Sequence, residues 1–426
     1  MQRLILQELL AWKASENRKP LILKGARQVG KTWILKKFGS EHFKKCIYLN
    51  FEASGVLQGL FEPDFDLKRI LSTIEIVSGI SVDENTLLIF DEIQEAPKGL
   101  TALKYFYENA PEYFVVAAGS FLGISLQQNH AFPVGKVDFL FLYPLSFEEF
   151  LLNSGEELLH RHLREGNVSI IRPFHEKLIS LLRAYYFTGG MPEVLDAWLK
   201  KRDVKQVRAL QQKILLGYEN DFGKYAPAAD VPKIRQVWVS VIRQLAKENR
   251  KFTYSELKKG ARAQEFETSI QWLVNAGLVY KCHRISKPAI PLKSYAEPDA
   301  FKLYLLDVGL LNAMAGIDAQ TLLLKNQVLK EYKGAMTEQF VCQVLREKYE
   351  LFYWSSERGN AELDFLIQKE SSVIPIEVKA EENLKAKSLA VYAEKFKPEE
   401  AIRLSMSFFR EQDWMRNMPL YAAFLV

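Results

Sequence analysis

Eight consecutive residues near the amino terminus have the types and spacing of a phosphate-binding loop. They are Gly25, Ala26, Arg27, Gln28, Val29, Gly30, Lys31 and Thr32. Glycines let backbone N–H groups converge on phosphate oxygens where a Cβ would block the approach. Lys31 supplies a positive charge for the terminal phosphates, and the Thr32 hydroxyl suits Mg²⁺. The stretch therefore predicts a site for ATP or GTP together with Mg²⁺.

The residues on either side of this loop favour the same interpretation. The apolar run Pro20–Leu23 precedes it, and a helix-like run Trp33–Phe38 follows it. The amino terminus of such a helix would direct its positive end at the phosphates. The alternative is a glycine-bounded turn that ends in Lys-Thr by chance.

Two carboxylates follow a second apolar run, over residues 86–90. Asp91 is expected to bind Mg²⁺ through water, and Glu92 to orient and deprotonate the attacking water. The pair indicates hydrolysis as well as binding, so the expected enzyme is an ATPase, with Lys31 and Glu92 as catalytic residues.

A further apolar run ends at Gly119 and Ser120. It would bring the Ser120 hydroxyl to the γ-phosphate from a neighbouring strand, as a third catalytic residue. A plain serine in a turn explains the pattern equally well.

The bulk composition is that of a globular intracellular protein with more than one domain. The chain has 426 residues, of which 48% are hydrophobic, and a formal charge of +5. That charge permits contact with nucleic acid without requiring it. Three widely spaced cysteines form no disulfide framework, and no segment has the pattern of a signal peptide or a membrane span. We expect a cytoplasmic protein without membrane contact.

The hydrophobic pattern changes character three times along the chain. Residues 1–150 alternate strand and helix patterns, which predicts an α/β P-loop core with a parallel sheet. Residues 151–230 are helical and are interpreted as a lid. Residues 231–330 resemble a winged helix, and residues 331–426 a small α/β domain.

The winged-helix region does not carry the charges of a base-reading protein. Helix-like pieces at 237–248, 254–261 and 265–276 precede a β-like run, and the third piece contains two glutamates and no lysine or arginine. Its first turn would repel phosphate, so a scaffold or protein-contact role is favoured. The nearby basic residues are Lys258, Lys259 and Arg262. The only nucleic-acid contact that they make plausible is with the backbone.

A second set of charges lies in the last hundred residues. Asp364 falls in one strand pattern, Glu377 and Lys379 share a face of the next, and Glu338 lies on the preceding helix. Such residues can bind one or two divalent ions and activate water against a phosphodiester. This predicts a second metal site in a nuclease-like fold, although a short D…ExK spacing is common by chance and such folds often persist without activity.

Taken in order, these segments resemble the uncharacterised prokaryotic AAA-type ATPases that join a P-loop domain to a carboxyl-terminal domain of unknown function. The likeness rests on Gly25–Thr32, Phe90–Gln94, Gly119–Ser120, Pro144–Phe147, Gly189–Glu193, Tyr304–Gly309 and Glu362–Lys379. The resemblance implies an AAA-like core, a winged-helix middle and a restriction-endonuclease-like end. This sequence departs from the family pattern at Lys136. Similar ATPases often carry an arginine before the Pro-Leu-Ser-Phe turn, and a lysine lacks the bidentate fork of an arginine finger.

Three functions remain open from the sequence. The leading one is an ATPase whose nucleotide state positions the middle and carboxyl-terminal domains on a partner, either DNA, RNA or a protein. The second is an ATP-regulated, metal-dependent nuclease. The third is a nucleotide-switched binding protein with an inactive carboxyl-terminal site. An oligomer is compatible with all three.

Overall fold

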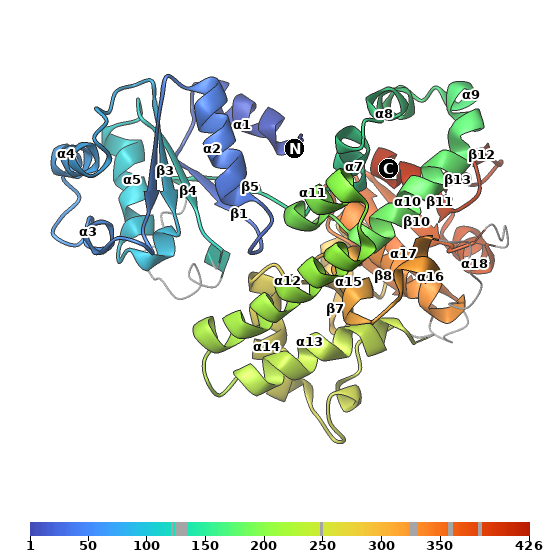
Figure 1. Cartoon of the computed structure of the whole chain (residues 1–426). Coiled ribbons are helices and arrows are strands. Elements are labelled where there is room, and N and C mark those ends of the chain that lie inside the picture. Colours follow the sequence, from blue (N-terminus) through green and yellow to red (C-terminus); the bar gives the residue numbers. More distant parts are fainter. Residues whose placement is uncertain (121, 124–134, 248–249, 324–329, 357–360, 382–385) are drawn as a thin grey trace. The chain divides into compact units, whose positions relative to one another are not determined.

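The computed structural model describes residues 1–120, 122–123, 135–247, 250–323, 330–356, 361–381 and 386–426 (Figure 1). These residues form two compact units. The first consists of residues 2–143 with 275–277, and the second of residue 1 with 144–274 and 278–426.

The first unit is built on a five-stranded parallel sheet with the strand order β2-β3-β4-β1-β5. Its strands are β1 (Leu21–Lys24), β2 (Lys45–Asn50), β3 (Thr86–Asp91), β4 (Phe114–Ala118) and β5 (Asp138–Phe141). Its helices are α1 (Ile5–Ala14), α2 (Lys31–His42), α3 (Gly55–Gln58), α4 (Leu67–Ser78), η1 (Ile93–Glu95) and α5 (Gly99–Asn109). The interior strand β3 is buried along its whole length because helices cover both faces of the sheet, which explains its apolar run over residues 87–90.

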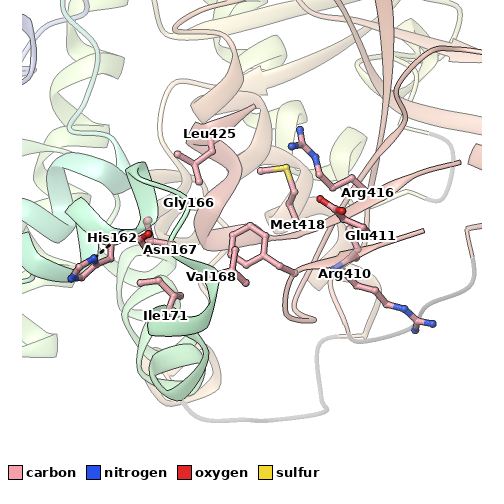
Figure 2. Close-up of a pocket in the computed structure, with 13 residues that line it drawn as sticks. His162, Gly166, Asn167, Val168, Ile171, Arg410, Glu411, Arg416, Met418 and Leu425 are labelled. Carbon is pink, nitrogen blue, oxygen red and sulfur yellow. Dashed lines mark hydrogen bonds between the residues drawn. The ribbon is translucent and has the colours of Figure 1, made fainter. Parts of the chain in front are cut away.

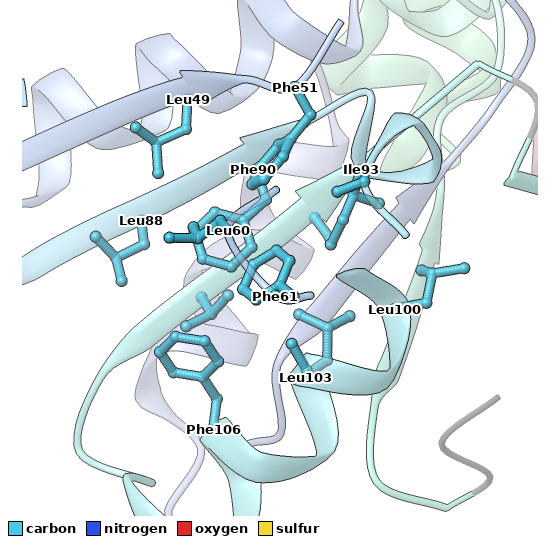
Figure 3. Packing of buried hydrophobic residues seen from close by; sticks show 14 of the residues in the cluster. Leu49, Phe51, Leu60, Phe61, Leu88, Phe90, Ile93, Leu100, Leu103 and Phe106 are labelled. Atoms are coloured by element: carbon cyan, nitrogen blue, oxygen red, sulfur yellow. The ribbon is translucent and has the colours of Figure 1, made fainter. Parts of the chain in front are cut away.

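One face of this sheet packs on α4 and α5 through a cluster of aliphatic and aromatic side chains (Figure 3). Phe90 of β3 lies at its centre and makes edge contacts with the rings of Phe51 and Phe106. On the opposite face, Trp12 of α1 contacts the rings of Phe38 in α2 and Phe114 in β4. The alternation of side chains along each strand thus supplies two cores, and these fix the strand ends that carry the candidate site.

The second unit joins a group of helices to an eight-stranded mixed sheet. Its helices are α7 (Phe147–Asn153), α8 (Glu157–Arg164), α9 (Val168–Ile171), η2 (Arg172–Phe174), α10 (His175–Thr188), α11 (Pro192–Lys201), α12 (Val204–Tyr225), α13 (Val231–Leu245), η3 (Tyr254–Glu256), α14 (Ala263–Asn275), η4 (Leu292–Tyr295), α15 (Val308–Met314), α16 (Ala319–Leu323), α17 (Lys330–Leu345), α18 (Lys387–Phe396) and η5 (Leu420–Leu425). Its strands are β6 (Val279–Ile285), β7 (Ala296–Leu305), β8 (Phe352–Ser355), β9 (Glu362–Lys369), β10 (Ser372–Val378), β11 (Ile402–Ser405), β12 (Arg410–Glu411) and β13 (Arg416–Pro419).

The strand order of this sheet, β12-β13-β11-β10-β9-β8-β6-β7, combines two regions that the sequence pattern separates. The hairpin β6–β7 comes from residues expected in the winged-helix region, and β6 pairs in parallel with β8 of the carboxyl-terminal region. The helix expected at 254–261 is only the short turn η3. The division into four domains, including the winged helix, therefore stays a prediction.

Local signals in the sequence explain where several of these helices begin. A capping box begins α7, since Ser146 and Glu149 exchange side chain to backbone hydrogen bonds there. The buried Asp307 carboxylate caps α15 by accepting from Leu310 N–H, and its other oxygen accepts from Gly190 N–H at 2.7 Å. This carboxylate links α15 to the turn between α10 and α11.

In the part of the chain that the structure describes, no helix combines the length and the apolar composition that crossing a bilayer requires.

Candidate functional site

The predicted phosphate-binding loop connects the end of β1 to the start of α2. Gly30 has a φ of 95° and directly precedes the first residue of α2, a conformation that favours glycine. A Cβ on Gly25 would lie 2.3 Å from the carbonyl oxygen of Leu142, so only glycine allows this close approach. The spacing of the two glycines is thus explained by the path of the backbone.

Lys31 lies at the first position of α2 with 6% of its surface exposed. Its Nζ donates hydrogen bonds to the carbonyl oxygens of Gly25 at 2.9 Å and Ala26 at 2.8 Å. Burial lowers the pKa of the Lys31 ammonium to about 8, although the negative charges of Glu92 and Asp91 act in the opposite direction. The ammonium therefore lies within the loop, close to the two acids predicted to act with it.

Thr32 and Asp91 are brought into direct contact. The Thr32 hydroxyl donates to Asp91 Oδ2 at 2.7 Å, and Asp91, at the end of β3, is 3% exposed. The same carboxylate oxygen accepts from the hydroxyl of Tyr48 at 2.9 Å. Burial, with the Asp91 charge next, raises the pKa of Tyr48, so the phenol stays protonated and remains a donor.

The sequence pattern does not predict a role for Tyr48. It lies on β2, which pairs with β3 so that Tyr48 is opposite Ile89 and Asn50 is opposite Asp91. Nothing in a single sequence shows that these two strands are neighbours in the sheet, so the only signal was a tyrosine within a strand pattern.

Glu92 and Ser120 are also in direct contact, through two hydrogen bonds. The Ser120 hydroxyl donates to Glu92 Oε1 at 3.0 Å, and its backbone N–H donates to Oε2 at 3.2 Å. Gln94, which the sequence reasoning gave no role, donates to Oε2 at 2.6 Å. A Cβ on Gly119 would lie 2.0 Å from Gln94 Oε1, which explains the glycine before Ser120. Among the residues that the structure describes, two N–H groups and one hydroxyl donate to the Glu92 carboxylate.

The predicted second site consists of Glu338, Asp364, Glu377 and Lys379. These residues lie on neighbouring elements, but the three carboxylates are paired with lysine and arginine side chains of the same chain. Glu338, on α17, is fully buried and pairs with Arg250 and, at 3.1 Å, with Lys302. Asp364, on β9, accepts from the backbone N–H of Val378 at 2.7 Å, and its Oδ1 lies 3.7 Å from Arg250 Nη1.

Glu377 of the same set is 2% exposed and pairs with Lys379 at 2.9 Å. Burial raises the pKa of Glu377, the Lys379 charge opposes this rise, and the Asp364 charge adds to it. Within the described ranges, no group of three or more His, Cys, Asp or Glu side chains is arranged to bind a metal ion. The second metal site that the sequence predicts is therefore not supported, because Arg250, Lys302 and Lys379 neutralise these acids.

A separate cavity of about 410 Å³ lies in the second unit, where α8 and α9 face β12 and β13 (Figure 2). Apolar side chains such as Met418 and Leu425 line it together with the charged Arg410 and Arg416. It contains none of the residues predicted from the sequence, so it does not bear on either candidate site.

Three family models match separate parts of the chain. Residues 17–151 match an AAA domain, residues 179–321 a domain of unknown function (DUF8612), and residues 333–420 another (DUF4143). The match to residues 17–151 and the parallel-sheet core confirm the predicted α/β fold class and support an AAA-type P-loop ATPase. The restriction-endonuclease-like fold of the carboxyl-terminal region stays a prediction.

Several solved structures are similar to this chain at low identity and low TM-score. The Walker-type ATPase PABY2304 of Pyrococcus abyssi is 16% identical, over 74% of this chain and 95% of that chain, with a TM-score of 0.46. The Aeropyrum pernix Orc1 protein in complex with DNA is 14% identical, over 75% and 92%, with a TM-score of 0.29. No curated protein matches the chain.

Proposed function

We propose that this protein binds ATP with Mg²⁺ at residues 25–32 and hydrolyses it. The observation that carries the proposal is the contact of Thr32 with Asp91 beside the buried ammonium of Lys31. A hydroxyl, a carboxylate and an ammonium at a helix amino terminus are the groups that a magnesium–triphosphate complex requires.

In this proposal each side chain has a separate role. The backbone N–H groups of residues 25–32 bind phosphate oxygens, and the Lys31 ammonium exchanges its two carbonyl partners for the terminal phosphates. Thr32 and Asp91 would hold Mg²⁺, which supplies charge neutralisation of the phosphates. Tyr48 fixes the orientation of the Asp91 carboxylate.

Glu92 is the proposed general base, and Ser120 and Gln94 determine when it can act. In the structure the Glu92 oxygens accept hydrogen bonds from Ser120 and Gln94, and an attacking water needs the same oxygens. Proton abstraction from water therefore requires Glu92 to exchange some of these donors for the attacking water. Ser120, once released, is the donor that reaches the γ-phosphate.

Two substitutions with matched controls test these roles. Lys31→Ala should abolish binding of a fluorescent ATP analogue, whereas Lys37→Ala, at a half-buried position further along the same helix, should bind as the wild type does. Glu92→Gln should retain binding and lower the turnover number at least about a hundredfold, whereas Glu95→Gln should hydrolyse normally. Equal hydrolysis by Glu92→Gln and wild type would remove Glu92 from its role.

The partner of the second unit is proposed to be nucleic acid, contacted through its backbone. Lys258, Lys259 and Arg262 are exposed between η3 and α14, whereas the exposed Glu265 in the first turn of α14 disfavours base reading. Replacing the three cations by alanine should weaken retention of duplex DNA about equally for all sequences and reduce its dependence on salt. If the triple variant retained duplex DNA as the wild type does, the proposed partner would be a protein instead.

The nuclease alternative has no contact in its favour, because the carboxylates it needs are paired with cations of the chain. Metal-dependent cleavage of DNA or RNA that disappears in Asp364→Ala would restore it.

A further inference from the structure

One arginine near the amino terminus bridges the candidate phosphate-binding loop and the last residue of the first unit. Arg3, which precedes α1, donates from Nη1 to the carbonyl oxygen of Val29 at 3.0 Å and from Nη2 to that of Tyr143 at 2.7 Å. Val29 belongs to the loop over residues 25–32, and Tyr143 is followed directly by the second unit at Pro144. A single guanidinium therefore connects three segments that are distant in the sequence.

The backbone brings the same segments together where the loop begins. The parallel pairing of β1 with β5 extends to Lys24, and the Leu142 N–H donates to the carbonyl oxygen of Lys24 at 2.7 Å. The carbonyl oxygen of Leu142 lies so close to Gly25 that a Cβ there would approach it to 2.3 Å. Residues 142–143 therefore adjoin the first residue of the loop directly, and Arg3 joins them to a point near its end.

The contact with Val29 fixes the direction of an N–H group that the proposed site uses. A trans peptide bond is planar, so its C=O and N–H groups point in opposite directions. Because Arg3 holds the Val29 carbonyl, the N–H of Gly30 is directed away from the guanidinium. Gly30 has a left-handed φ of 95° and precedes the first residue of α2, so this peptide bond lies outside the helix. The guanidinium supplies a fixed donor that orients it.

We propose that Arg3 is a positioning residue of the nucleotide site, which orients the peptide bond between Val29 and Gly30 for phosphate binding and ties the loop to residues 142–143. This inference rests on the proposed binding of ATP at residues 25–32. A guanidinium suits the role because its donors lie in a rigid plane, so it holds two carbonyl oxygens from different segments at a fixed separation. By linkage, a phosphate that stabilises the loop also stabilises residues 142–143, and loosening that segment weakens phosphate binding.

Arg3→Gln removes the bridge, and Arg18→Gln is its matched control. Arg18 also lies in the first unit, and its Nη2 donates to the carbonyl oxygens of Pro111 and Glu112, each at 3.0 Å, which lie outside the loop. In the presence of Mg²⁺, Arg3→Gln should bind a fluorescent ATP analogue at least about tenfold more weakly than the wild type does. Arg18→Gln should bind it as the wild type does.

Steady-state ATP hydrolysis separates positioning from a loss of folded protein. The bridge orients a group that binds phosphate equally in the ground state and the transition state, so Arg3→Gln should raise KM about tenfold and keep kcat within about twofold of the wild type. A partly unfolded chain would instead lower kcat at an unchanged KM, which would count against the proposal. Arg3→Lys, which keeps the charge but lacks the planar fork, should recover part of the affinity.

Hydrogen exchange of the wild type tests the tie to residues 142–143 even if Arg3→Gln does not fold. Saturation with adenosine 5′-(β,γ-imido)triphosphate and Mg²⁺ should slow amide exchange of residues 138–143 at least about threefold and leave α4 unchanged. A folded Arg3→Gln chain should lose this slowing.

Two results would overturn this inference alone. One is unchanged exchange of residues 138–143 in a wild type that binds the analogue, and the other is equal ATP affinity of Arg3→Gln and the wild type. A wild type that binds no ATP would overturn the proposed function, and this inference with it.

Discussion

The buried ammonium of Lys31 leads to a prediction about pH. Phosphate binding requires the charged form of this lysine, and burial lowers its pKa from 10.5 to about 8. In the free protein the charged fraction then falls from about nine tenths at pH 7 to about one tenth at pH 9. The affinity for ATP should fall about tenfold over this interval, equivalent to about 1.4 kcal/mol of binding free energy.

The matched control for this prediction is Lys31→Arg, since a guanidinium stays charged throughout the range. Isothermal titration calorimetry of both chains with the same ATP and Mg²⁺ solutions removes the titration of the ligand itself, because that contribution is common to both. The variant is expected to bind more weakly overall but with little change between pH 7 and pH 9. Equal slopes for the two chains would refute the claim that the Lys31 ammonium causes the pH dependence.

The same shift in pKa has a consequence for folding. Between pH 8 and pH 10.5 the unfolded chain binds more protons at Lys31 than the folded chain does, so the free energy of unfolding should rise with pH in this window. Urea denaturation of wild type and Lys31→Met isolates the effect, because only the wild type should show it. A parallel pH dependence in both chains would contradict it.

Two further predictions concern single contacts. Tyr48→Phe removes one hydrogen bond to Asp91, worth about 1 kcal/mol, so half-maximal ATPase activity should need about fivefold more Mg²⁺, while binding of ATP without metal stays unchanged. An unchanged Mg²⁺ requirement would leave Tyr48 with a purely structural role. Gly309→Ala should lower the free energy of unfolding by about 1–3 kcal/mol, since its Cβ would lie 2.4–2.5 Å from the backbone of residues 188–189. Gly223→Ala on α12, with nothing within 4 Å of the new methyl group, is the control, and equal melting curves for the two variants would be the contrary result.

The sequence determined the local parts of the nucleotide site. Glycine at positions 25 and 30, the ammonium of Lys31 and the two acids at the end of β3 are readable because each depends on a few neighbouring residues. The apolar strand patterns likewise predicted the alternating first unit, since a strand covered on both faces is apolar over most of its length. The capping box at Ser146 and Glu149 was readable for the same reason, because both partners lie within one turn.

Only the tertiary structure decided which distant side chains meet. Tyr48 reaches Asp91 because β2 is the neighbour of β3, and Arg250 reaches Glu338 because residues far apart in the sequence pack in one unit. The hairpin β6–β7 joins the carboxyl-terminal sheet through a parallel pairing that no local pattern encodes. Periodicity shows that a residue lies on a strand or a helix, but strand order and packing between elements arise from burial over the whole chain.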